Sequence, residues 1–203
     1  MDDPVSRTTA SYDRIAPVFA ERTSDPDDGF LAFRRRFADA VPVGGAVADL
    51  GCGPGRDAAW LLERELLVTG VDRSIEMARL AATRGVPTVL GDLRRPPFAP
   101  GSLSGLWSVA ALLHVPAAET EPTLRAWSTL LRPGGVLGLS TSAGDGEGWE
   151  PISYDAELTR WFVHRDPDTL LATLETAGFE VLEHGLSTTH RTWLSVLARR
   201  CKV

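Results

Sequence analysis

A glycine-rich turn between a short apolar segment and a helix-like one constrains this chain more than any other feature. Residues 46–50 are largely apolar, the turn Gly51-Cys-Gly-Pro-Gly55 follows directly, and residues 57–62 have a helical pattern. Glycines at a strand-to-helix junction let the backbone turn sharply and let a ligand lie against main-chain atoms with no Cβ in the way. The junction therefore predicts an α/β domain with a binding site at the end of its first strand.

Short apolar segments and longer helix-like segments alternate along the rest of the chain. This alternation is typical of a parallel sheet with helices on both faces. We expect strands at residues 46–50, 68–71, 87–90, 104–109, 136–140, 179–183 and 192–198, and helices at 57–62, 74–84, 119–131 and 168–177. Two stretches fall outside the pattern: residues 1–41, where Pro17 and Pro26 should separate helical pieces, and residues 142–167, an aromatic-rich insertion expected to be irregular.

Composition argues against several classes of protein. The 203 residues include 27 Asp plus Glu against 21 Lys plus Arg, a net charge of −6, whereas proteins that bind phosphate backbones usually have the opposite balance. No apolar run approaches the roughly 18 residues of a membrane span, and the acidic N-terminal residues do not resemble a signal peptide. Two cysteines, Cys52 and Cys201, make neither a disulfide framework nor a zinc site. We expect a cytoplasmic protein that binds neither nucleic acid nor a membrane and holds no metal.

Three aspartates come at or near the ends of the first three expected strands, at Asp49, Asp72 and Asp92. Ligands of doubly wound folds bind outside the carboxyl ends of parallel strands, where these side chains should meet. Asp72, about 20 residues beyond the turn, suits the two hydroxyls of an unphosphorylated ribose. The alternative is that each aspartate only caps the following turn, but three in register with a glycine-rich turn favour a ligand site.

The turn also discriminates between nucleotide cofactors. A dinucleotide fingerprint is G-x-G-x-x-G, whereas the third glycine here, Gly55, comes one position early. Asp57 places a negative charge in the first helical turn, where it would compete with a diphosphate, and no Gly-Lys-Ser/Thr of a phosphate-binding loop follows. The site therefore suits an adenosine that carries no phosphate.

These residues resemble the class I S-adenosylmethionine-dependent methyltransferases, and the small-molecule branch of that family most closely. The resemblance covers roughly residue 12 to the end and rests on residues 47–55, 70–74, 91–93, 131–137, 177–179 and 194–199. It implies a doubly wound, Rossmann-like sheet of seven strands in the order 3-2-1-4-5-7-6, with the last strand antiparallel and helices on both faces. It also implies an N-terminal helical lid over residues 1–41, and a catalytic domain over residues 42–203 whose insertion at about 142–167 borders the acceptor.

The resemblance implies that S-adenosyl-L-methionine is the cofactor and S-adenosyl-L-homocysteine the product. The residues expected to bind this cofactor are Tyr12, Asp49, Gly51, Cys52, Gly53, Asp72, Arg73, Asp92, Leu93 and Ala110. One position departs from the family, because many members have a hydrophobic residue where Arg73 follows the ribose-binding acid.

Methyl transfer from a sulfonium is an in-line displacement, so the protein must mainly align the acceptor, exclude water and, for a protonated acceptor, supply a base. The candidate catalytic residues are His114, His164 and Tyr12, and the candidate acceptor-binding residues are His114, Trp149, Tyr154 and Trp161. The alternatives are that His114 packs under a turn and that the aromatic rings only hold the insertion in place. The run Arg34-Arg35-Arg36 is expected to be a solvated helix face.

The sequence thus predicts a methyltransferase that acts on a small molecule at an O, N or C atom, as a monomer or homodimer. The alternatives are a non-methylating enzyme on the same cofactor, such as an intramolecular cyclase, a non-catalytic cofactor-binding protein, or a dehydrogenase. Identification of the cofactor and of its reaction product would separate them.

Overall fold

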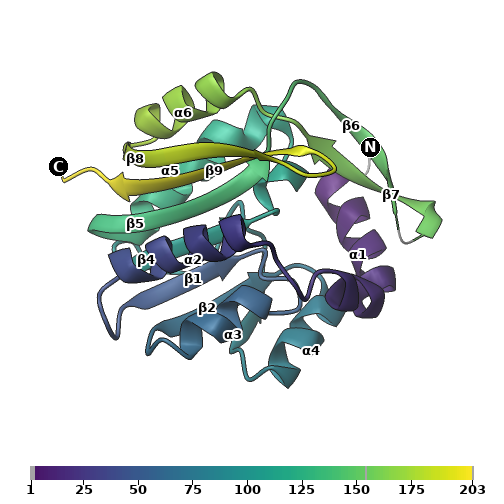
Figure 1. The fold of residues 1–203 in the computed structure, drawn as a ribbon, viewed down its shortest axis with the longest axis horizontal. Coiled ribbons are helices and arrows are strands. Elements are labelled where there is room, and N and C mark those ends of the chain that lie inside the picture. Colours follow the sequence, from purple (N-terminus) through teal and green to yellow (C-terminus); the bar gives the residue numbers. More distant parts are fainter. Residues whose placement is uncertain (1–2, 154, 203) are drawn as a thin grey trace.

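A seven-stranded sheet lies at the centre of the molecule (Figure 1). The structure is a computed structural model that describes residues 3–153 and 155–202. The strands follow the order β3-β2-β1-β4-β5-β9-β8, and β9 is antiparallel to both of its neighbours. Their bounds are β1 Ala46–Leu50, β2 Leu67–Asp72, β3 Thr88–Leu90, β4 Leu103–Val109, β5 Leu131–Ser142, β8 Phe179–Thr188 and β9 Thr192–Arg200. The predicted fold and strand order are confirmed, since the last two strands of this sheet in chain order are β8 and β9.

Helices cover both faces of the sheet because each presents one apolar stripe to it. One face packs against α2 (Asp28–Ala40), α3 (Arg56–Leu62) and α4 (Ile75–Thr83), and the other against α5 (Thr120–Leu130) and α6 (Pro167–Thr176). On the first face, Phe33 and Phe37 lie one turn apart on α2 and contact the buried Trp107 ring of β4, with centroids 5.1 and 4.8 Å away. These contacts position α2 across the central strands.

The first helix, α1 (Pro4–Arg22), is continuous, so the prediction that Pro17 interrupts it was wrong. A proline inside a helix removes a hydrogen bond and crowds the preceding turn, at a cost of about 3 kcal/mol. Side chains of α1 bind both neighbours and offset this cost: Asp13 accepts a hydrogen bond from Ser74 at the start of α4, and Thr8 accepts one from the backbone of β7 (Asp155–Val163). Figure 1 shows α1 between these two elements.

The insertion forms a two-stranded antiparallel hairpin of β6 (Glu147–Ile152) and β7, not the irregular segment expected from sequence. A lone hairpin is only marginally stable in water. Here Ile152 and Leu158 pack on Ile15 of α1, and the hydroxyl of Ser11 donates to the carbonyl of Thr159 at 2.7 Å. The helix therefore stabilises the hairpin and fixes it beside the sheet edge. No helix in the part of the chain that the structure describes has the length and apolar character needed to span a bilayer.

Candidate active site

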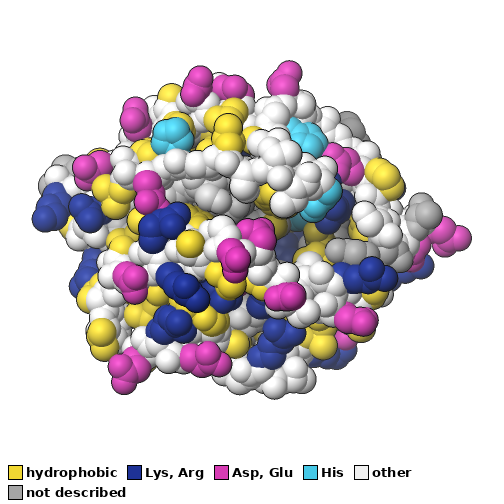
Figure 2. Space-filling view, in the orientation of Figure 1, with side chains coloured by type: hydrophobic (Ala, Val, Ile, Leu, Met, Phe, Trp, Pro, Cys, Tyr) yellow, Lys and Arg dark blue, Asp and Glu magenta, His cyan; other side chains and the backbone are white. Residues whose placement is uncertain are grey.

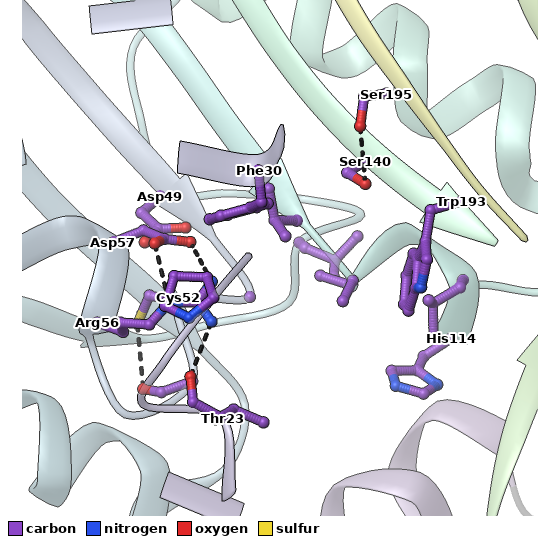
Figure 3. Close-up of a pocket in the computed structure, with 18 of the residues that line it drawn as sticks. Thr23, Phe30, Asp49, Cys52, Arg56, Asp57, His114, Ser140, Trp193 and Ser195 are labelled. Atoms are coloured by element: carbon purple, nitrogen blue, oxygen red, sulfur yellow. Dashed lines mark hydrogen bonds and ion pairs between the residues drawn. The ribbon is translucent and has the colours of Figure 1, made fainter. Parts of the chain in front are cut away.

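A cavity of about 620 Å³ opens over the carboxyl ends of the parallel strands. Asp49, Cys52 and Asp57 lie on one side of it and His114 and Trp193 on the other (Figure 3). On the face drawn in Figure 2, acidic and basic side chains are interspersed. Every residue predicted to bind the cofactor lines this cavity, namely Tyr12, Asp49, Gly51, Cys52, Gly53, Asp72, Arg73, Asp92, Leu93 and Ala110. Their gathering is a structural observation, and their binding roles stay predictions.

The glycine-rich turn presents bare backbone to this cavity. Gly51 has a φ of +75°, and a Cβ there would lie 2.3 Å from the Cβ of Ala111, so no other residue fits without rearrangement. Gly53 has a φ of +53°, and a Cβ there would meet only the ring of Phe19, at 3.9 Å. The surface beside Gly53 is thus open for a ligand to lie against the main chain.

Asp72 holds the turn in this shape. Its two carboxylate oxygens accept hydrogen bonds from the backbone N–H groups of Gly53 and Ser74, each at 2.8 Å. Burial raises the pKa of Asp72 above its ordinary value, and these backbone hydrogen bonds oppose the rise. A carboxylate offers about four acceptor positions, so Asp72 keeps capacity to accept from a ligand hydroxyl.

Asp92 belongs to an ion-pair cluster that reaches the start of α1. It accepts hydrogen bonds from Arg73 at 2.9 Å and from Arg94 at 2.6 Å, and Arg94 also pairs with Asp3. Burial alone would raise the pKa of Asp92, but the hydrogen bonds and charge of Arg94 outweigh it and lower the pKa. Arg73, where the sequence departs from many members of the family, thus has Asp92 as its partner, and any ligand at Asp92 would share this carboxylate with two guanidinium groups.

A second charged cluster lies buried under the cavity. Asp57 accepts hydrogen bonds from Arg34 at 2.8 Å, from Arg56 at 2.9 Å and from the indole N–H of Trp107 at 3.3 Å. Burial would raise the pKa of Asp57, but the ion pairs with Arg56 and Arg34 lower it. Arg34 is only 5% exposed, so the prediction of a solvated arginine face was wrong at this position. Asp49 lies nearby, and burial together with the charge of Asp57 raises its pKa well above the ordinary value.

A hydrogen-bonded chain connects α1 to the loop after β4. The hydroxyl of Tyr12 lies 2.8 Å from Nε2 of His114, whose Nδ1 lies 2.6 Å from the carbonyl oxygen of Trp161. A carbonyl only accepts, so Nδ1 carries the proton and Nε2 accepts from the Tyr12 hydroxyl. The Tyr12 oxygen in turn accepts from Arg160 at 3.1 Å. Burial lowers the pKa of His114 to about 3, despite the opposing hydrogen bond to Trp161. His114 is therefore neutral near pH 7, with both nitrogens engaged.

Acid is expected to destabilise the protein through His114. In the unfolded chain this imidazole titrates near its ordinary pKa of 6.5, whereas its pKa in the folded protein is about 3. Protons then bind preferentially to the unfolded chain, so stability is lost as the pH falls from about 6.5 toward 3. Between pH 7.5 and pH 5 the loss through this group is about 2 kcal/mol. Urea unfolding at both pH values should show that the wild type loses about this much more unfolding free energy than His114→Gln does. Equal pH dependence of the unfolding free energy in the two proteins would contradict the prediction.

Three other residues predicted for catalysis or acceptor binding, His164, Trp149 and Trp161, do not line the cavity. His164 is held by the Ser142 hydroxyl at 2.8 Å and by Glu150 at 2.7 Å. Trp149 and Trp161 form an edge-to-face pair with centroids 5.4 Å apart, and neither lines the cavity. Tyr154 lies outside the described residues. Among the predicted acceptor residues that are described, the structure brings His114 alone to the cavity.

Sequence reasoning missed most of the wall opposite the glycine-rich turn. The β8–β9 hairpin and β7 supply it, with His184, His190, Arg191, Trp193 and Ser195 from the hairpin and Arg160 and Phe162 from β7. Because β9 is antiparallel and β8 returns parallel to the central strands, the carboxyl end of β8 lies at the same edge as the glycine-rich turn. Applying the strand-end rule to β8 would have found this hairpin.

Comparison with known proteins agrees with this architecture. Residues 47–135 match a family described as a methyltransferase domain. The matched residues make up less than half of the chain, and the match agrees with the family predicted from the sequence. An uncharacterized methyltransferase of Geobacillus kaustophilus is 29% identical over 194 residues, which are 93% of this chain and 80% of that relative. The chain spans only 18–38% of the length of three other curated relatives it matches.

Solved structures share the methyltransferase fold over almost the whole chain. Magnesium protoporphyrin IX methyltransferase from Synechocystis PCC 6803, with bound SAM, has a TM-score of 0.74 at 17% identity and covers 98% of each chain. The [4+2]-cyclase SpnF has a TM-score of 0.77 at 19% identity and covers 98% of this chain and 97% of its own. The first agrees with the predicted cofactor. Among the described residues, no group of three or more His, Cys, Asp or Glu side chains is arranged to hold a metal.

Proposed function

We propose that this protein transfers the methyl group of S-adenosylmethionine to a small molecule bound between Tyr12, His114 and the β8–β9 hairpin. The observation that carries the proposal is that one cavity contains both the predicted cofactor residues and the Tyr12–His114 pair. The cofactor supplies an activated methyl group with its own leaving group. The chain's task is therefore to align the acceptor and exclude water, which can contribute several kcal/mol.

The residues on each side of the cavity fit these tasks. The open backbone at Gly53 and the free acceptor positions of Asp72 suit a nucleoside without phosphate. With both nitrogens engaged and a pKa near 3, His114 is suited to holding the Tyr12 hydroxyl, whose proton it accepts in a hydrogen bond, so that the Tyr12 oxygen faces the acceptor. The direct role as a base that the sequence predicts would require one of these hydrogen bonds to break. We propose α1 as the lid, since it carries Tyr12 and contacts both α4 and β7.

Product analysis tests the proposal. The purified protein is incubated with S-adenosylmethionine and panels of small carboxylic acids, phenols and amines, and the products are identified by mass spectrometry. Methyl transfer yields S-adenosylhomocysteine and an acceptor heavier by one methylene, whereas intramolecular displacement on the donor yields methylthioadenosine. The fold likeness to a cyclase makes this distinction necessary. Calorimetric binding of S-adenosylhomocysteine is the prior requirement, and its absence would refute the proposal.

Removing the Tyr12 hydroxyl is expected to slow turnover without weakening the binding of the cofactor. Tyr12→Phe leaves Nε2 of His114 without a donor and Arg160 without its acceptor, so kcat should fall by about 10-fold or more while the Kd of S-adenosylhomocysteine changes little. Because the two side chains act as a pair, the double variant with His114→Ala should be little slower than either single variant. Additive losses in this cycle would show that Tyr12 and His114 act independently.

A further inference from the structure

Arg160 brings a positive charge to the acceptor side of the cavity without a balancing carboxylate. It lines the cavity and donates to the Tyr12 hydroxyl at 3.1 Å. Within the described part of the chain, no Asp or Glu oxygen lies within 4.0 Å of its guanidinium nitrogens, and its Nε is shielded from water with no hydrogen-bond partner. A shielded cationic donor of this kind is costly unless something compensates it.

The charge of Arg191, which lies in the turn just before β9, is only partly compensated. Its Nη2 pairs with Glu150 at 3.2 Å, and the same carboxylate also accepts a hydrogen bond from His164 at 2.7 Å. Its Nη1 is shielded from water and has no hydrogen-bond partner. Glu150 is not part of the cavity wall, whereas Arg191 is.

Both guanidinium groups lie near the ring of Phe162, which also contacts His114. The Cζ of Arg160 lies 5.1 Å, and the Cζ of Arg191 4.1 Å, from the centroid of this ring. The centroid of the His114 ring is 5.7 Å from it. Cation–π contacts hold an arginine in place without neutralising its charge. The two arginines therefore border one region of the cavity, next to the Tyr12–His114 pair.

Four of the other carboxylates that line the cavity are already engaged, and none of them pairs with Arg160 or Arg191. Glu183 is paired with Arg36 at 2.6 Å, Asp92 with Arg73 and Arg94, and Asp57 with Arg34 and Arg56, while Asp72 binds the backbone of the glycine-rich turn. The positive charge of Arg160 and Arg191 thus remains for a ligand. An amine acceptor would meet repulsion in this region.

We propose that the acceptor carries a carboxylate group, which Arg160 and Arg191 bind at the face of Phe162. This inference rests on the proposed function and assigns the chemical class of its acceptor. Guanidinium groups bind planar carboxylates through paired N–H donors. Glu150 partly balances the charge of Arg191, so the two arginines together offer less than two net positive charges, which matches a singly charged carboxylate better than a phosphate of nearly two charges.

Binding of matched acids and amides tests the proposal. Protein saturated with S-adenosylhomocysteine is titrated with benzoate, phenylacetate and hexanoate and with benzamide, phenylacetamide and hexanamide, followed by saturation-transfer NMR and calorimetry, with phenyl phosphate as a further probe. At least one acid is expected to bind 10-fold or more tightly than its amide and than phenyl phosphate. Equal binding of acid and amide, no binding of either, or a preference for phenyl phosphate would overturn the proposal.

Three variants show whether the two arginines are responsible. Arg191→Gln and Arg160→Gln should each weaken the preferred acid about 10-fold or more, with unchanged affinity for S-adenosylhomocysteine. Glu150→Gln should strengthen binding of the preferred acid, because the Glu150 carboxylate no longer competes with the ligand for Arg191. A merely structural role of the arginines would not make this variant bind more tightly while the arginine variants bind more weakly. The exposed Arg35→Gln, away from the cavity, is the matched control. If S-adenosylhomocysteine itself does not bind, the proposed function fails, whereas its binding without a preference for acids refutes this inference alone.

Discussion

Replacing Asp72 by alanine is expected to weaken the binding of S-adenosylhomocysteine by about 100-fold or more. The variant loses the predicted acceptor for the ribose hydroxyls, and it also releases the N–H groups of Gly53 and Ser74 that the carboxylate now binds. Hydrogen bonds to a charged group contribute about 1.5–3 kcal/mol each, and about 2.7 kcal/mol corresponds to 100-fold in affinity. Isothermal titration calorimetry measures the change directly.

Two further variants separate ligand binding from support of the turn. Asp72→Asn keeps one carbonyl acceptor and the side-chain volume, so its affinity should fall between wild type and Asp72→Ala. Asp39→Ala removes an exposed aspartate at the end of α2 and should bind normally. Affinity like that of the wild type in Asp72→Ala would mean that the cofactor lies elsewhere.

Asp57→Ala is expected to lower the free energy of unfolding by about 3–5 kcal/mol. The substitution leaves Arg34 charged, buried and without its partner, and it also removes the acceptor of the Trp107 indole N–H. Breaking a buried pair in this way costs more than the pair itself contributes, because one charge stays behind in a poorly solvated position. Urea unfolding followed by tryptophan fluorescence is the measurement.

A double variant keeps this prediction testable even if Asp57→Ala does not fold. Arg34→Met combined with Asp57→Leu removes both buried charges and fills similar volume, so it should recover most of the lost stability, while Arg56 can turn toward solvent. A single variant as stable as wild type would indicate that the buried pair contributes nothing to folding.

The cofactor half of the cavity could be predicted from sequence because its determinants are local. The turn from Gly51 to Gly55 and the strand-end acids Asp72 and Asp92 depend on the backbone within one or two elements, and the order of parallel strands then brings them to one edge. The same reasoning located the seven strands of the central sheet and most of the helices, but not the β6–β7 hairpin. Pro17 was misjudged because contacts from α4 and β7, which are remote in sequence, hold the helix around it.

The acceptor half could not be predicted because it depends on which side of a hairpin faces inward. In β7, Arg160 and Phe162 line the cavity, whereas Trp161 between them does not. Successive side chains of a strand point to opposite sides, so a shift of one residue decides which of them reach the cavity. Counting aromatic rings in the insertion selected Trp149 and Trp161 instead. Likewise, no local pattern shows that Arg34 is buried against Asp57 while Arg35 is exposed.

The cofactor side and the acceptor side of the cavity both border α1. We therefore expect movement of this helix to accompany the binding and release of ligands on either side. The helix binds the start of α4 through Asp13, the edge of β7 through Thr8, and His114 through Tyr12. A methyl donor held beneath α1 should enter before the acceptor, and the S-adenosylhomocysteine formed from it should leave after the methylated product. A compulsory order of addition and release is therefore the expected kinetic scheme. Detachment of this one helix would then limit turnover wherever it is slower than the bond-making step.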